Sequence, residues 1–105
     1  MIAQYIYVMR DHKNLYKIGI SSDVVKRAKT ISRAKGREVT LYWHSDRPIY
    51  NASKIENTIH KFYRNCHAYG EWFLFSYDID GVVSKIQREI EKNGVFTKPS
   101  TKGKD

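Results

Sequence analysis

Two tyrosines and a lysine near the start of the chain have types and a spacing that suit proton transfer. Tyr5 and Tyr7 alternate with Ile6 and Val8, which is typical of a half-buried strand, and a second strand-like run carries Lys17. The expected hairpin register places Tyr7 opposite Lys17. A phenol has a pKa of about 10, and a neighbouring ammonium favours its ionised form, which can take a proton from water.

Glu56 is the second candidate for chemistry. It falls inside the apolar stripe of a helix expected from about Asn51 to Cys66, and His60 lies one turn further on. A carboxylate that faces a core is unfavourable unless it is paired or binds a metal ion. Helix geometry favours two explanations equally. In the first, His60 or a tyrosine hydroxyl satisfies Glu56; in the second, Glu56 holds a metal ion.

A basic helix is expected between the hairpin and the third strand, from about Asp23 to Lys35. Arg27 lies at the edge of its apolar stripe, where a solvated arginine is the common outcome. The outer face carries further cations beside the hairpin, so phosphate binding and a simple solvated face are equally favoured. These cations are Lys26, Lys29, Arg33 and Lys35.

The remaining segments complete a small α+β domain. A third strand is expected at 39–44, an aromatic extended segment at 70–75, and a last helix that Asp78 caps. This order predicts a three-stranded antiparallel sheet flanked by helices, in the order β-β-α-β-α-α. A single domain is expected over 1–94, followed by a basic, flexible tail over 95–105.

The composition points to a polyanionic partner. The 105 residues include 19 Lys and Arg against 11 Asp and Glu, a net charge of +8, which favours nucleic acid first and an anionic membrane second. No apolar run approaches the length of a membrane span and no signal peptide is recognised, so no membrane association is expected. The lone Cys66 excludes an internal disulfide and suits a reducing cytoplasm.

Taken in order, the motifs resemble those of the GIY-YIG nuclease superfamily. The similarity is greatest to a compact branch, common in phages and bacteria, with K-I-G, E-x-x-x-H and G-E-W-F motifs. The similarity extends over roughly residues 4–76. The order and spacing of the motifs together are more specific than any single motif. The matching residues are Tyr5-Ile6-Tyr7, Lys17-Ile18-Gly19, Arg27, Glu56 to His60, and Gly70 to Phe73.

The resemblance implies a DNA endonuclease that depends on Mg²⁺ or Mn²⁺. Tyr7 matches the tyrosine of the first motif, Gly19 the glycine of the second, Arg27 the helical arginine and Glu56 the metal-binding glutamate. His60 would orient that carboxylate or a water on the metal. If the chain is encoded by a phage, its expected location is the host cytoplasm.

This sequence departs from the family pattern in three places. Tyr5 stands where the first motif has glycine, and Lys17 stands where many members have tyrosine, although active members with lysine occur. No counterpart of the late asparagine of many members can be placed.

Three functions therefore remain open. The first is a metal-dependent endonuclease acting on double-stranded DNA, which Tyr7, Lys17, Arg27 and Glu56 together favour. The second is a non-catalytic DNA-binding module of the same fold. The third is an interaction protein that docks on another nucleic-acid enzyme. The specificity for DNA or RNA and the formation of a homodimer are left open by the sequence.

Overall fold

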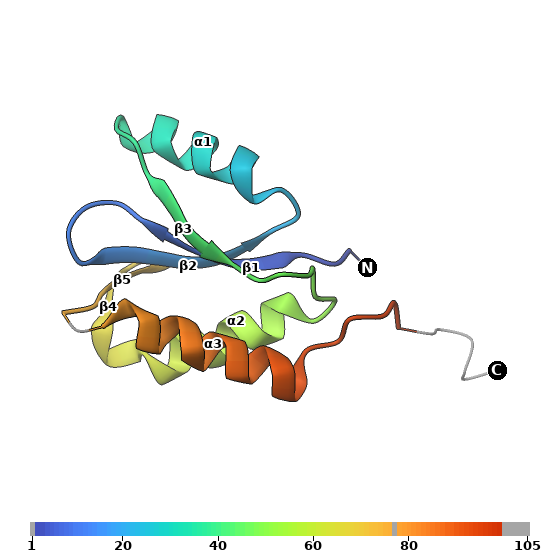
Figure 1. Ribbon diagram of the computed structural model, residues 1–105. Coiled ribbons are helices and arrows are strands. Elements are labelled where there is room, and N and C mark those ends of the chain that lie inside the picture. Colours follow the sequence, from blue (N-terminus) through green and yellow to red (C-terminus); the bar gives the residue numbers. More distant parts are fainter. Residues whose placement is uncertain (1, 77, 100–105) are drawn as a thin grey trace.

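Five antiparallel strands form one sheet in the computed structural model, which describes residues 2–76 and 78–99. The strands are Tyr5–Arg10 (β1), Leu15–Ser21 (β2), Thr40–His44 (β3), His67–Tyr69 (β4) and Trp72–Leu74 (β5). In space they lie in the order β3-β1-β2-β5-β4, so β1 and β2 each have a neighbour on both sides (Figure 1).

Helices cover both faces of this sheet. The first helix, α1, lies over one face, and the other two, α2 and α3, lie side by side over the opposite face (Figure 1). A short 3-10 turn, η1, follows α2 and leads into β4. The bounds are Val24–Lys35 (α1), Ala52–Phe62 (α2), Arg64–Cys66 (η1) and Ile79–Asn93 (α3).

The α+β class is confirmed, but the prediction of a three-stranded sheet is wrong. The α2 helix ends at Phe62, four residues before the expected end, and the chain then forms η1 and β4. Gly70 has φ +54, a conformation that glycine adopts readily, and it turns the chain back so that β5 pairs with both β4 and β2. The aromatic segment is therefore part of the sheet and brings Glu71 beside β2.

The hairpin register is shifted by two residues from the expected one. Tyr7 pairs with Gly19, and Lys17 pairs with Met9 instead of Tyr7. The cause is the turn. The Asp11 amide donates to the Leu15 carbonyl at 3.0 Å, so the three residues 12–14 connect the two strands beyond this bond. Because side chains alternate along a strand, a shift of two leaves every side chain on its expected face.

The two faces of the sheet support cores of different size. The larger core lies under α2 and α3 and includes Ile6, Val8 and Ile18, which are fully buried. The smaller core lies under α1 and includes Tyr7 and Trp72. Tyr7 therefore lies in the smaller core, between the sheet and α1.

The ends of the helices follow local chemistry. Asp23 caps α1 by accepting from the Lys26 amide, and Gly36 ends the helix with φ 74. Asp78 caps α3 as expected.

The segment after α3 is at first bound to the domain, because the Val95 amide donates to Asn51 Oδ1 at 2.9 Å. The end of the expected tail, 100–105, lies outside the described residues. Within the described part of the chain, none of the helices combines the length and the apolarity needed to span a membrane.

Candidate active site

The phenol of Tyr7 lies directly over Gly19. A Cβ atom at position 19 would lie 2.5 Å from Tyr7 Oη and 2.7 Å from Tyr7 Cζ, well inside the separation of about 3.5 Å at which non-bonded carbons begin to repel. Tyr7 is 1% exposed, so its ring has no other position available without repacking. Gly19 is therefore needed at this position because it leaves room for the hydroxyl of Tyr7.

Glu71 is the residue of this site that the sequence analysis missed. Its Oε1 would lie 3.1 Å from a Cβ on Gly19, so the Glu71 carboxylate and the Tyr7 hydroxyl flank the same point of β2. Lys17 Nζ donates to Glu71 Oε1 at 2.9 Å. The expected contact of Lys17 with Tyr7 is thus wrong, because the register places the ammonium beside Glu71. The signal was present in the sequence, since Glu71 is the one acid in the aromatic segment 70–75.

Glu56 is buried, and one of its oxygens has no hydrogen bond to the described residues. Glu56 is 7% exposed, and its Oε2 has no partner. His60 Nε2 lies 3.9 Å from that oxygen, but it donates to the Ile18 carbonyl at 2.8 Å. His60 is therefore held against β2 and makes no hydrogen bond to Glu56 Oε2, although the two side chains lie within ion-pair distance.

The electrostatics of these groups oppose ionisation. Burial, followed by the charge of Glu71 and a hydrogen bond with its side chain, raises the pKa of Glu56 from its ordinary 4.5 to about 7, although Lys17 opposes the shift. The pKa of Tyr7 is also raised above its ordinary value, first by burial and then by Glu71, while Arg27 acts to lower it. The expected phenolate of Tyr7 is therefore disfavoured in the domain alone. We call Tyr7, Lys17, Gly19, Glu56 and Glu71 the Glu56 cluster.

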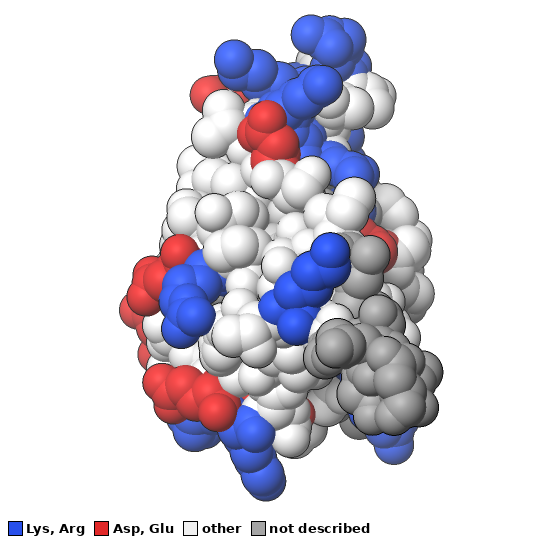
Figure 2. All heavy atoms as spheres, turned by 90° about the vertical axis from the view of Figure 1, so that its right-hand side faces the viewer, with Lys and Arg blue, Asp and Glu red and all other residues white. Residues whose placement is uncertain are grey.

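The α1 helix presents exposed cations beside this cluster. Arg27 is exposed near a hollow at the start of α1, which Ser21 and Thr30 also line. Lys and Arg side chains gather at the top of Figure 2, where α1 lies in Figure 1. Among the predicted phosphate contacts, those with exposed side chains are Lys26, Lys29 and Arg33.

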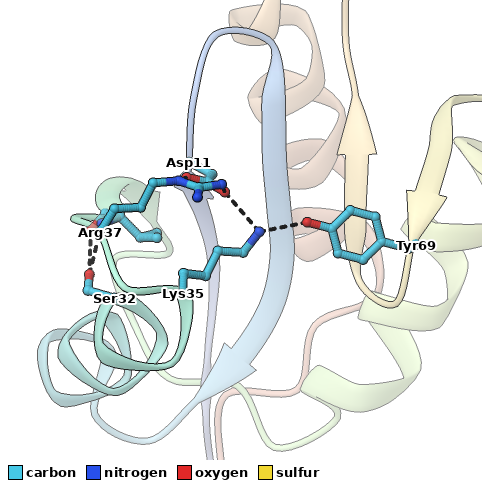
Figure 3. Close-up of polar contacts among 6 residues, drawn as sticks. Asp11, Ser32, Lys35, Arg37 and Tyr69 are labelled. Atoms are coloured by element: carbon cyan, nitrogen blue, oxygen red, sulfur yellow. Dashed lines mark hydrogen bonds and ion pairs between the residues drawn. The ribbon is translucent and has the colours of Figure 1, made fainter.

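Lys35 departs from the prediction of a solvated phosphate contact. Its Nζ lies 2.8 Å from Asp11 Oδ2, donates to Tyr69 Oη at 2.6 Å, and lies 4.3 Å from the centre of the Trp72 ring. Figure 3 shows Lys35 reaching from the end of α1 to both polar partners. Its charge is therefore used inside the domain. We call Asp11, Lys35, Arg37 and Tyr69 the Asp11 cluster.

Tyr5 lies next to the candidate site without joining the Glu56 cluster. It pairs with Ser21, and its ring packs edge-on against His44 with 5.6 Å between ring centres. Tyr5, which stands where the GIY-YIG pattern has glycine, thus contributes packing at the end of β1.

The comparison with known protein families matches residues 4–92 to the T5orf172 domain. The chain belongs to the T5orf172 family. This family is associated with nuclease-type domains, and the match includes every strand and nearly all of α3. No curated protein and no solved structure matches the chain.

Glu56 and Glu71 carry the carboxylate oxygens that a hard divalent cation would need as ligands. Within the described residues, no group of three or more His, Cys, Asp or Glu side chains could hold a metal ion. Glu56, with its unpartnered buried oxygen and with Glu71 nearby, would therefore supply few ligands and leave the other positions to water. Mg²⁺ typically binds in this way, through one or two carboxylates and several waters.

Proposed function

We propose that this T5orf172 domain is an endonuclease of the GIY-YIG type that hydrolyses double-stranded DNA with Mg²⁺ or Mn²⁺. The observation that carries the proposal is the buried Oε2 of Glu56, which accepts no hydrogen bond from the described residues and whose carboxylate acts electrostatically on the phenol of Tyr7. A buried carboxylate oxygen without a hydrogen bond is unfavourable, and a bound cation would satisfy it.

Each residue has a distinct role in the proposed reaction. Glu56 would hold the divalent ion, which when bound supplies positive charge for the departing alkoxide. Arg27 would bind the non-bridging oxygens of the scissile phosphate, since a guanidinium offers forked donors to phosphate. Lys17 would hold Glu71 in place through the 2.9 Å contact.

Tyr7 would act as the general base. It takes a proton from the attacking water, whose oxygen forms a bond to phosphorus while the bond to the leaving oxygen breaks. Burial and the two carboxylates keep the phenol protonated in the domain alone, and Arg27 acts in the opposite direction. The base role therefore requires that the negative charge of Glu56 and Glu71 is compensated when substrate is bound.

A DNA-binding module without catalysis is the second candidate. One observation favours it, namely the raised pKa of Tyr7, which works against a base at neutral pH. Under this alternative the exposed cations of α1 would still bind phosphates, and the Glu56 cluster would be inactive.

Incubation of supercoiled plasmid with the protein separates the two candidates. The wild type is expected to nick the plasmid in Mg²⁺ or Mn²⁺ and to lose this activity in EDTA, while Glu56→Gln should not nick. Both proteins should bind the same DNA in EDTA, which serves as the control for folding. A wild type that binds DNA but does not nick it in either metal would favour the binding module.

A further inference from the structure

A second basic surface lies across the sheet from α1. A shallow groove runs between the end of α2 and the turn from β4 to β5, on the side of the sheet that α2 covers (Figure 1). We call it the α2–β4 groove. Its lining residues are His60, Lys61, Arg64, His67, Gly70 and Phe73.

The groove is rigidly built. Its base is Phe73, which is 1% exposed, and the rings of His60 and His67 pack against it with centres 5.0 Å and 5.5 Å away. Each histidine donates Nε2–H to a backbone carbonyl at 2.8 Å, one to Ile18 and the other to Gly70. The hollow is therefore formed before any ligand arrives, which lowers the entropy lost on binding.

Positive charge dominates its rim. Lys61 and Arg64 are exposed, and Arg64 Nη1 donates to the Lys61 carbonyl at 3.2 Å, which holds the guanidinium at the edge of the groove. Within the described part of the chain, no ion pair joins either residue to a carboxylate, whereas Lys17 and Lys35 each have one. None of the described residues that line the groove is an acid. Its charge is thus available to an external anion.

The groove adjoins the Glu56 cluster. His60 lines the groove and also lies 3.9 Å from Glu56 Oε2. Gly70, another lining residue, directly precedes Glu71. The α1 helix lies over the other face of the sheet (Figure 1), so the sheet, with Lys17 and Gly19 on β2, lies between α1 and the α2–β4 groove.

We propose that the α2–β4 groove binds the phosphate backbone of the substrate strand, on the opposite side of the scissile phosphate from α1. This inference rests on the proposed function of the Glu56 cluster. Lys61 supplies a compact charge, and Arg64 supplies donors that match two phosphate oxygens. Phosphate contacts of this kind position a strand and carry no sequence information.

The test compares three double variants that each remove one lysine and one arginine. Lys61→Gln with Arg64→Gln alters the groove, and Lys29→Gln with Arg33→Gln alters α1. Arg88→Gln with Lys92→Gln alters exposed positions of α3 and is the matched control. Binding of a fluorescent DNA duplex is measured by anisotropy in EDTA over a range of salt concentrations, with melting temperatures as the check on folding.

The groove variant should bind about tenfold more weakly than the wild type, and the α3 control should change by less than about twofold. The slope of log K against log salt should fall by about two units, because each phosphate contact contributes about 0.9. A groove variant that binds like the control, while the α1 variant is weakened, overturns this inference and leaves the proposed function intact. A wild type that does not bind DNA at all overturns the proposed function itself.

Discussion

Two buried carboxyl groups lie near opposite ends of the β1–β2 hairpin, and they behave in opposite ways. The side chain of Asp11, at the turn, is 0% exposed, yet its pKa is lowered from 3.8 to about 2 because Arg37 and then Lys35 donate to it. Glu56, on α2, is also buried, yet its pKa is raised to about 7 and one of its oxygens accepts no hydrogen bond from the described residues.

The difference fits our proposal that Asp11 serves the fold and Glu56 serves a ligand. Arg37 forms two 2.8 Å hydrogen bonds to Asp11, and Lys35 neutralises it further, so this cluster is complete within the domain. Glu56 and Glu71 bring two carboxylates to one place, where Lys17 is the cation in direct contact. When both carboxylates are ionised, the Glu56 cluster therefore carries one negative charge more than Lys17 neutralises, which favours an external cation.

The largest expected effect is on DNA cleavage. It appears when a tyrosine hydroxyl is removed from the Glu56 cluster and, in a separate variant, from the Asp11 cluster. Tyr7→Phe should slow plasmid nicking by roughly 10²-fold or more, the usual contribution of a general base, with DNA affinity and melting temperature nearly unchanged. Tyr69→Phe removes the hydroxyl that contacts Lys35 and should leave nicking as in the wild type. Nicking by Tyr7→Phe at the wild-type rate would assign the base role to another group.

The next effect is on stability, when each carboxylate is replaced by its amide. Asp11→Asn removes the partner of two cations and should lower the free energy of unfolding by about 1–3 kcal/mol. Glu56→Gln should leave the stability of the metal-free protein unchanged or raise it, because the fold already favours the neutral form. Denaturant unfolding in EDTA measures both. A loss in Glu56→Gln as large as that in Asp11→Asn would make Glu56 a structural residue.

A smaller effect should appear in the pH dependence of melting without metal. The unfolded Glu56 ionises near 4.5 and the folded one near 7, so its favourable contribution is complete below 4.5 and is lost as the pH rises to 7. The contribution of Asp11 to stability has the opposite pH dependence, since it is complete above pH 3.8 and is lost as the pH falls towards 2. The melting temperature of the wild type relative to Glu56→Gln should therefore fall between pH 4.5 and 7. A constant difference over that range would contradict the raised pKa.

Much of the fold could be predicted because it follows from periodicity within short segments. The faces of β1 and β2, the start of α3 at Asp78 and the end of α1 at Gly36 all depend on residues close in the sequence. The register could not be predicted, because it depends on the hydrogen bonds of a turn that permits connections of different length.

The site was predicted less completely for the same physical reason. Glu56 was identified because a carboxylate within an apolar stripe is conspicuous in a single helix. The partners of Lys17 and Lys35 come from residues 54 and 34 positions later, Glu71 and Tyr69, and depend on the strand pairing of β5 and β4. Contacts at such separation are set by the topology of the sheet, which a pattern within one segment does not specify.

The most direct test of the account is whether a divalent ion stabilises the protein through Glu56. Melting of the wild type and of Glu56→Gln is followed as Mn²⁺ is added. A ligand of the folded state at 100 times its Kd stabilises by about 2.7 kcal/mol, so the melting temperature of the wild type should rise with Mn²⁺ and that of Glu56→Gln should not. An equal rise in both proteins, or none in either, would contradict the assignment of Glu56 as the metal ligand.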